Sequence, residues 1–514
     1  MGTAVRRFAD RYVDSVLLLG ATRAMGEVEG VGWATAVMAT PANIEALGAD
    51  GVTDEALQIA AANDLVLVVR ADDDDVAAAA LDAGAHVLFG ERPAGASVRQ
   101  EATSHRDLAS AIGALPEADV AIISVPGPFA ALEAHKALTA GLDVLLFSDN
   151  VPVADEIDLK DHAAAVGHLV MGPGAGTAVL GGCGLGFANV VRAGRVGVVA
   201  AAGTGAQEVM SLLDRWGEGV TQVIGVGGRD LSAEVDGRMA RLAVRALDRD
   251  PATDIIVLVS KPPSAAVARS VIAAALDTPV VAALIGLAED AAVPGAAAHS
   301  TTLEGGVVAT MRALGGRAPE LNGQLRAEVE RQLIGLADHR TRLQGLYSGG
   351  TLCYEALALL EPWLGPVWSN TPLDKAHRVP APEGAHVCLD LGEEEYTKGR
   401  PHPMIDPEAR LEALRALATE PDVAVVLLDV VLGYGSHPDP ASLLAPACAE
   451  LTSPDGPRVV VYVLGTEGDP QGLERQRDAF ARAGCVVAPT GARAALAAAA
   501  IARRDPAIVE APPR

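Results

Sequence analysis

The feature that most constrains the fold is a repeated alternation between short runs of Val, Ile and Leu and longer Ala-rich segments with helical spacing. Strands that are apolar along their whole length are typical of parallel sheets covered by helices on both faces. We therefore expect an α/β protein with several doubly wound parallel-sheet modules. Breaks in composition near residues 115, 190 and 325 divide the chain into four modules, 1–115, 116–190, 191–325 and 326–514.

The strands expected from this alternation form two series. The first is Ser15–Leu19, Asp64–Val69, His86–Phe89, Val120–Val125, Asp143–Phe147, Val196–Ala200, Gln222–Val226, Ile255–Val259 and Val280–Ile285. The second is His386–Leu391, Val423–Val430, Arg458–Leu464 and Cys485–Ala488. Only 3% of the residues are aromatic and 54 are Gly, which favours aliphatic strands joined to Ala-rich helices by tight turns.

The charge balance argues against two classes of partner. The chain has 66 acidic and 40 basic residues, a net charge of −26, and such a field repels nucleic-acid phosphates and anionic lipid headgroups. We therefore expect neither a nucleic-acid nor a membrane partner. The five cysteines are widely spaced and odd in number, which indicates neither a disulfide framework nor a structural zinc site. No apolar run is long enough for a membrane span or a secretory signal, so we expect a cytoplasmic location.

Two segments resemble each other. Each has a small residue, Gly and Thr, and then a helical pattern with a Glu four residues after the Thr; they are Gly203-Thr204-Gly205 with Glu208, and Gly349-Gly350-Thr351 with Glu355. Gly lets the backbone approach a ligand, and the N–H groups at a helix start favour an anion. Two such helix starts could hold one phosphate or acyl phosphate between modules. The alternative is two ordinary capped helices whose Glu side chains face solvent.

A loop braced by three prolines carries Arg400, His402 and Asp406. Arg can hold a carboxylate or phosphate with two hydrogen bonds, and His can transfer a proton near neutral pH. We interpret Arg400 and His402 as functional, whereas Asp406 is better explained as the cap of the helix that begins after it. Lys261 and His437 follow the ends of expected strands, where ligands of parallel sheets bind, although each could equally be a solvated surface residue.

A set of motifs resembles the FdrA family, also called FdrA-like acyl-CoA synthetases. In chain order they are Phe147-Ser148-Asp149-Asn150-Val151, Gly227-Gly228-Arg229-Asp230-Leu231-Ser232, Val259-Ser260-Lys261-Pro262-Pro263, Tyr347-Ser348-Gly349-Gly350-Thr351-Leu352 and Gly399–Pro407. Segment Gly194–Leu231 is also similar to the succinyl-CoA synthetase α chain. The resemblance covers nearly the whole chain.

This resemblance implies a small N-terminal α/β module, a Rossmann-like domain of the CoA-binding type in 116–190, a flavodoxin-type domain in 191–325 and a CoA-ligase-type domain in 326–514. It implies that both Gly-Thr helix starts face a phosphate. We assign catalysis to His402, Arg400, Glu208 and Glu355, phosphate binding to Gly203, Thr204, Gly205, Gly349, Gly350 and Thr351, and substrate binding to Ser148, Asn150, Lys261, Asp390 and His437.

The sequence departs from these families in three places. Gly286–Asp290 lacks the phosphohistidine of succinyl-CoA synthetases, and His299 comes too late to replace it. No ATP-grasp domain separates the α-like part from the carboxyl-terminal module. Gly172-Pro173-Gly174-Ala175-Gly176 stands where the family has an acid and a thiol. We therefore expect neither a phosphoenzyme nor the formation of an acyl phosphate from ATP by this chain alone.

The function that the resemblance implies is that of a subunit of a phosphate-dependent carbamoyl or acyl transferase, which converts oxalurate and phosphate into oxamate and carbamoyl phosphate in ureide breakdown. Phosphate is then a co-substrate, CoA is a possible ligand, and neither a covalent cofactor nor a metal is expected. The partners are a small acyl or ureido acid and other subunits of a hetero-oligomer. The alternatives are an ADP-forming acyl-CoA synthetase with its ATP-grasp part on another chain, and a non-catalytic scaffold subunit.

Overall fold

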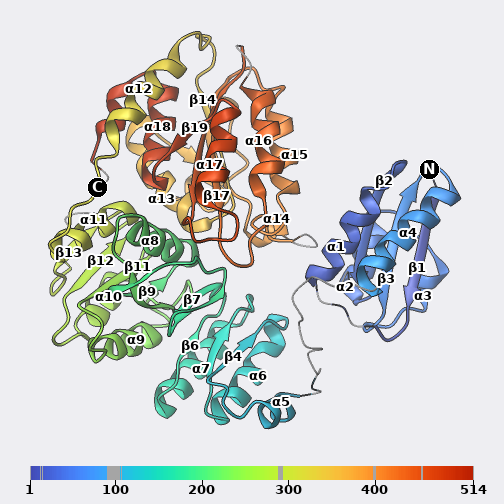
Figure 1. The fold of residues 1–514 in the computed structure, drawn as a ribbon, viewed down its shortest axis with the longest axis horizontal. Helices are drawn as coiled ribbons and strands as arrows, with labels where there is room; N and C mark the ends of the chain where they lie inside the picture. Colours follow the sequence, from blue (N-terminus) through green and yellow to red (C-terminus); the bar gives the residue numbers. More distant parts are fainter. Residues whose placement is uncertain are drawn as a thin grey trace. The chain divides into compact units, whose positions relative to one another are not determined.

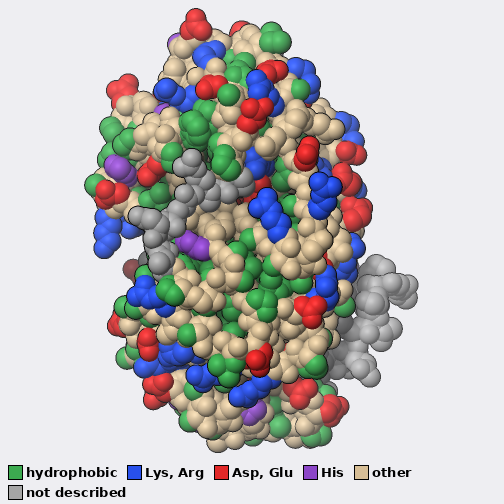
Figure 2. All heavy atoms as spheres, turned by 90° about the vertical axis from the view of Figure 1, so that its left-hand side faces the viewer, with side chains coloured by type: hydrophobic (Ala, Val, Ile, Leu, Met, Phe, Trp, Pro, Cys, Tyr) green, Lys and Arg blue, Asp and Glu red, His purple; other side chains and the backbone are tan. Residues whose placement is uncertain are grey.

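The computed structural model describes residues 2–11, 13, 15–89, 105, 107–287, 293–397, 401–452 and 455–512. The chain divides into two compact units, Met1–Ser104 and His105–Arg514, which we describe separately (Figure 1). No described helix is both long enough and apolar enough to cross a membrane. On the face shown in Figure 2, acidic and basic side chains are interspersed.

The first unit contains an antiparallel sheet with strand order β1-β3-β2. Its elements are β1 (Gly2–Phe8), α1 (Ser15–Gly26), β2 (Val31–Met38), α2 (Pro41–Ala49), α3 (Glu55–Gln58), β3 (Leu65–Ala71) and α4 (Asp74–Phe89). The predicted strands Ser15–Leu19 and His86–Phe89 are wrong, because these residues begin α1 and end α4. A short apolar run does not distinguish a strand from a buried helix turn, and Ala21 and Met25 continue the apolar face of α1 at a spacing of four.

The second unit begins with a three-stranded parallel sheet, β4-β5-β6. Its elements are α5 (Leu108–Ala114), β4 (Val120–Ile123), α6 (Gly127–Thr139), β5 (Asp143–Leu146), α7 (Val153–Val166) and β6 (Val170–Met171). A buried ammonium group joins this sheet to the next one. Lys160 Nζ in α7 donates to the carbonyl oxygen of Val226 at 2.9 Å and to Asp230 Oδ1 at 2.8 Å.

The next sheet has seven strands in the order β13-β12-β11-β9-β10-β7-β8. Its parallel part contains β9 (Ala193–Ala201), β10 (Val220–Gly225), β11 (Ile255–Ser260), β12 (Val280–Leu284) and β13 (Ala298–Ser300), and its helices are α8 (Gly203–Arg215), α9 (Arg238–Asp248), α10 (Ala265–Ile272) and α11 (Leu303–Ala313). The sequence did not indicate the antiparallel hairpin of β7 (Thr177–Leu180) and β8 (Cys183–Gly186) that extends the sheet beyond β10.

The last sheet has six parallel strands in the order β15-β16-β14-β17-β18-β19. The strands are β14 (Arg342–Tyr347), β15 (Val367–Trp368), β16 (His386–Asp390), β17 (Val423–Val431), β18 (Arg458–Leu464) and β19 (Val486–Ala488). The helices are α12 (Asn322–Leu333), α13 (Gly350–Leu364), α14 (Glu394–Thr397), α15 (Glu408–Leu417), α16 (Pro440–Leu451), α17 (Leu473–Arg482) and α18 (Gly491–Arg503), with short 3₁₀ turns at Lys375–His377 and Pro506–Glu510. The predicted α/β class with parallel-sheet modules is confirmed by these two sheets.

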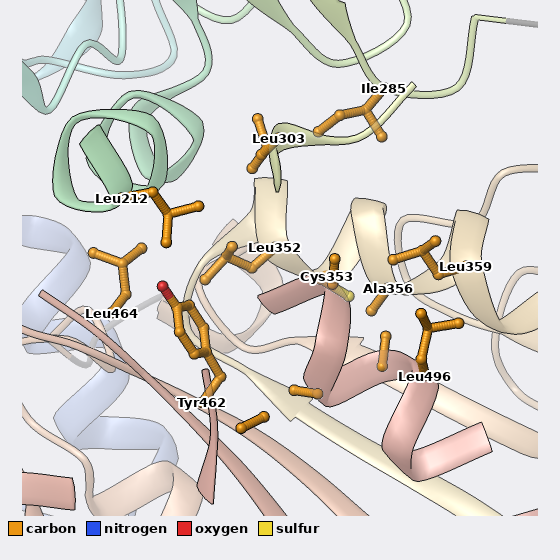
Figure 3. Close-up of a cluster of buried hydrophobic side chains, with 14 of the residues drawn as sticks. Leu212, Ile285, Leu303, Leu352, Cys353, Ala356, Leu359, Tyr462, Leu464 and Leu496 are labelled. Atoms are coloured by element: carbon orange, nitrogen blue, oxygen red, sulfur yellow. The ribbon is translucent and has the colours of Figure 1, made fainter. Parts of the chain in front are cut away.

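One hydrophobic core joins the seven- and six-stranded sheets. Figure 3 shows side chains from both sides of this core, among them Leu212 of α8, Leu303 of α11, Leu352 of α13 and Leu496 of α18, and the hydroxyl of Tyr462 points toward α8. All of these residues are at most 2% exposed. Helices α8 and α13 are therefore held against each other by close apolar packing, which fixes the positions of their N-termini.

Candidate functional site

A cavity of about 530 Å³ lies where the carboxyl ends of strands from both large sheets meet. In each large sheet the chain adds strands on one side of the first parallel strand, β9 or β14, and then crosses to its other side. Open parallel sheets bind ligands at the carboxyl ends of the strands where this reversal occurs. Lining residues include Phe147, Asp149, Phe187, Gly203, Thr204, Gln207, Gly228, Lys261, Ser348, Gly350, Thr351, Asp390, Gly392, Glu393, His402 and Met404. A larger hollow of about 940 Å³ lies between α11 and α12 and contains His299, but neither Gly-Thr turn reaches it.

The start of α8 offers backbone donors to the cavity. The N–H groups of Gly203, Thr204 and Gly205 precede the first helical hydrogen bond, which Ala206 N donates to Ala202 O at 2.9 Å. None of these three N–H groups has an acceptor among the residues that the structure describes. Such donors at the positive end of a helix are suited to an anion.

The start of α13 is arranged differently, because a buried carboxylate already occupies the preceding turn. Asp429 accepts hydrogen bonds from Ser348 N and Gly349 N, both at 2.7 Å, and from Ser348 Oγ at 3.0 Å. Arg410 Nη2 lies 3.3 Å from Asp429 Oδ1 and donates to Leu346 O at 3.2 Å. This turn is thus stabilised by an internal anion.

The two helix starts touch each other. Thr351 N donates to Thr204 Oγ1 at 3.2 Å, so the hydroxyl of one motif caps the helix of the other. A Cβ atom on Gly205 would lie 3.1 Å from Thr351 Cγ2, and one on Gly349 would lie 2.7 Å from Thr204 Cγ2. The prediction that both helices begin at the Gly-Thr turns and face a common cleft is confirmed.

Lys261 and Asp390 form a charged part of the cavity wall. Lys261 follows the last residue of β11, and Asp390 ends β16. Asn370 fixes the backbone of Asp390, since its Oδ1 accepts from Asp390 N at 2.9 Å and its Nδ2 donates to Asp390 O at 2.8 Å. Burial raises the pKa of Asp390 to about 6, against the opposing effect of Lys261.

His402 adds a neutral donor to an aromatic part of the wall. Its ring centroid lies 6.0 Å from that of Phe187, which lies 5.7 Å from that of Phe147. Burial lowers the pKa of His402 to about 4. Met404 N donates to His402 Nδ1 at 3.3 Å, so the neutral ring carries its proton on Nε2. His402 is therefore suited to donate a hydrogen bond to a substrate oxygen.

Glu208 and Glu355 lie behind the helix starts and do not line the cavity. Glu208 of α8 accepts from Gly491 N at the start of α18 at 3.3 Å and from the hydroxyl of Tyr462. Glu355 of α13 accepts from Leu303 N at the start of α11 at 2.6 Å. Each carboxyl group thus caps a helix of the other sheet. Burial raises the pKa of Glu208 to about 7 and that of Glu355 to about 8.

The remaining predicted residues lie apart from the cavity or outside the described residues. Ser148 is buried and donates to the carbonyl oxygen of Val125, and Asn150 is exposed in a left-handed conformation with φ 57°. His437 is buried beside the loop that carries His402 and Met404, and its Nδ1 accepts from Asp439 N at 3.1 Å. Arg400 lies outside the described residues. Asp406 lies one residue before Pro407, which occupies the N-cap position of α15, and its Oδ1 accepts from Glu408 N at 3.0 Å.

Sequence reasoning missed Asp429, Arg410 and Asn370, which hold the turn before α13 and the backbone of Asp390. A signal was available for Asp429, because it is the one charged residue in the apolar run Val423–Val431. A charge within a fully buried strand requires a partner. The sequence does not reveal which residue that partner is.

Family models and named relatives match parts of the chain. Residues 346–501 match the CoA-ligase family, and residues 1–105 match the family described as AllF, heavy metal-associated domain. The chain is 28% identical over 148 residues to the α subunit of ADP-forming succinate–CoA ligase from Methanothermobacter thermautotrophicus, covering 28% of this chain and 49% of that subunit. Among solved structures, the apo form of dinucleotide-forming acetyl-coenzyme A synthetase 1 from Ca. Korarchaeum cryptofilum matches 76% of this chain and 84% of its own, with 17% identity and a TM-score of 0.28.

The CoA-ligase match and the α-subunit similarity make the parts of the chain that they cover acyl-CoA ligase-like. Over 515 residues the chain is 37% identical to the uncharacterized protein YahF of Escherichia coli strain K12, covering 95% of this chain and 96% of YahF. The chain therefore belongs to the same family as YahF.

The description of the N-terminal match raises the question of a metal. The residues do not fit one: all five cysteines lie at position 183 or later, and no group of three His, Cys, Asp or Glu side chains able to hold a metal ion occurs within the described ranges. We derive no step through a metal.

Proposed function

We propose that this chain is the acyl-transfer subunit of an acyl-CoA ligase-like enzyme, and that it moves an acyl group between inorganic phosphate and CoA. The observation that carries the proposal is the cavity in which three N–H groups of α8 without acceptors and the ammonium of Lys261 stand opposite the CoA-ligase module. A helix start with a nearby cation is suited to phosphate.

In this proposal, phosphate oxygens accept hydrogen bonds from Gly203, Thr204 and Gly205, and Lys261 balances their charge. The neutral His402 donates from Nε2 to the carbonyl oxygen of the acyl group, where negative charge develops during transfer. Phe147 and Phe187 exclude water from that side of the cavity.

The chain's proposed place is in a hetero-oligomer. The relative from Methanothermobacter thermautotrophicus is named as the α subunit of succinate–CoA ligase, and the match spans about half of that subunit. The sequence lacks a nucleotide domain between the α-like part and the CoA-ligase module, so formation of an acyl phosphate from ATP requires a partner chain.

A second candidate is carbamoyl transfer between phosphate and the nitrogen of oxamate, as in the FdrA-like proteins that the motifs resemble. The match of residues 1–105 to an AllF domain favours it. So does the absence of any His between residues 169 and 298 of the sequence, because carbamoyl transfer to phosphate requires no phosphohistidine.

The two candidates share a phosphate site and differ in the acceptor. The purified chain, alone and with co-purified partners, is titrated with inorganic phosphate, and is then supplied with acetyl phosphate and CoA, or with carbamoyl phosphate and oxamate. Saturable phosphate binding with formation of acetyl-CoA supports the first candidate, and formation of oxalurate supports the second. Failure to bind phosphate contradicts both.

A further inference from the structure

We propose that Asp390 takes up the proton that the acceptor loses when the acyl or carbamoyl group is transferred. This inference rests on the proposed function, to which it adds a further catalytic residue. The thiol of CoA and the amide nitrogen of oxamate both lose a proton when they form a bond to the carbonyl carbon. A base that faces the cavity accelerates such a step.

One carboxylate oxygen of Asp390 accepts a backbone hydrogen bond, and the other has no donor among the described residues. Oδ1 accepts from Gly392 N at 2.9 Å, and Asn370 fixes the backbone on both sides. Oδ2 has no donor among the described residues and adjoins the first residue of α13, because a Cβ atom on Gly350 would overlap it. Lys261 Nζ lies 3.4 Å from that same Cβ position. Oδ2 thus lies between the start of α13 and the ammonium group.

Burial and three charged groups set the pKa of Asp390. Burial disfavours the carboxylate, Lys261 after β11 favours it, and Glu393 in the same loop and Asp429 of β17 disfavour it. His402, which adjoins Gly392, is neutral. The result, a pKa near 6, leaves Asp390 ionised at pH 7 and still basic enough to accept a proton during the reaction.

A role in holding phosphate fits Asp390 poorly, because two anions repel each other. The phosphate donors lie on α8, and Lys261 is placed to interact with both the phosphate and Asp390. The cavity is thus divided into a phosphate part along α8 and a proton-accepting part at the end of β16.

The step balances as follows. The acceptor sulfur or nitrogen forms a bond to the carbonyl carbon, the bond between that carbon and the phosphate oxygen breaks, and the acceptor's proton moves to Asp390 Oδ2. The departing phosphate carries the electron pair of the broken bond and takes the proton from Asp390 as it leaves. In the reverse direction, protonated Asp390 returns the proton to sulfur or nitrogen.

The test compares Asp390→Asn with the exposed-surface control Glu395→Gln in the co-purified complex. Asn keeps the shape and the contact to Gly392 but cannot accept a proton. We expect kcat with acetyl phosphate and CoA, or with carbamoyl phosphate and oxamate, to fall about a hundredfold or more. Affinity for inorganic phosphate should stay unchanged or increase, the decline of kcat below pH 6 should disappear, and Asp390→Glu should restore part of the rate.

Three results overturn the proposal. A kcat within twofold of wild type shows that Asp390 is not the base. A loss of phosphate affinity that accounts for the whole loss in kcat/KM shows a binding role. If the wild-type complex turns over with neither acceptor, both the proposed function and this inference are wrong. If the wild type turns over at the same rate as Asp390→Asn, only this inference is wrong.

Discussion

Helices α8 and α13 begin with the same Gly-Thr pattern after equivalent strands, yet their surroundings differ in charge. Next to β9, the neighbouring strand β11 pairs Ser260 with Ala201 and is followed by Lys261. Next to β14, the neighbouring strand β17 carries Asp429, which binds the turn before α13. The start of α8 is therefore left with N–H groups that have no acceptor among the described residues, whereas the turn before α13 has an anion of its own; Lys261 lines the cavity that both helix starts share. A repeated motif can thus serve once for a ligand and once for the fold.

The largest effect that we expect concerns Glu208 and Glu355, which lie one turn along these two helices. Both have a pKa in the folded protein above the usual value of 4.5. Their contribution to stability is therefore complete at low pH and is lost as the pH rises through about 7 and 8. For the pair, the loss should reach several kcal/mol, on the order of 1.4 kcal/mol per pKa unit.

Urea unfolding between about pH 4 and pH 9 measures this effect, because the loss begins at the unfolded pKa of 4.5 and is complete above the folded values. The double variant Glu208→Gln with Glu355→Gln keeps both caps without a charge, so its stability should exceed that of the wild type at pH 9 and approach it near pH 4. The difference between the two curves cancels other titrating groups such as His402. Parallel curves over this range would contradict the prediction.

The second effect concerns the internal anion of α13. Asp429→Asn leaves the guanidinium of Arg410 buried and without its carboxylate, which should cost about 3–5 kcal/mol of unfolding free energy. Thermal unfolding of the full-length chain measures the loss. Adding Arg410→Met removes the unpaired charge, so the double variant should recover part of the stability; a double variant as unstable as the sum of the single ones would argue against a coupled pair.

The third effect concerns the phosphate that we propose to bind at the start of α8. Lys261→Met should weaken the binding of inorganic phosphate about ten- to a hundredfold, in line with about 1.5–3 kcal/mol for a hydrogen bond to a charged group. Titration calorimetry measures this, and the exposed Lys375→Met is the matched control. Equal losses in both variants would mean that phosphate responds only to net charge, and that the two helix starts do not differ in function.

The smallest effect concerns the contact between the two helix starts. Thr204→Val keeps the shape of the side chain but removes the hydroxyl that accepts from Thr351 N. We expect a loss of about 1 kcal/mol in unfolding free energy, typical of a lost cap. The control variant Thr351→Val keeps the backbone N–H that donates to Thr204, so its unfolding free energy should fall less. A larger fall in this variant would show that the hydrogen bond does not explain the loss of stability in Thr204→Val.

Much of this arrangement follows from sequence patterns, and its limits have physical causes. Strands β9 to β12 and β16 to β19 and both helix starts were predicted, because apolar runs and Gly-Thr turns are local signals. Strands β13, β14 and β15 were not predicted, although β14 lies between β16 and β17 in its sheet. The antiparallel pairing of β1, β2 and β3 was not, since strand direction depends on partners distant in sequence. Asp429 and Ser348 are 81 residues apart and Glu208 and Gly491 are 283 apart, so no local pattern records those contacts.

The exchange of caps between the two large sheets has a consequence for how such a protein could be divided or recombined. Each sheet supplies the carboxyl group that completes the first turn of a helix in the other: α8 for α18, and α13 for α11. If the coding sequence were split between α11 and α12, each fragment would have one helix N-terminus without its glutamate cap. Each would also have one buried glutamate without its backbone donor until the two fragments associated. Two such polypeptides would be obligate partners from synthesis onward, and a transplanted module would function only in a host that supplies the matching glutamate.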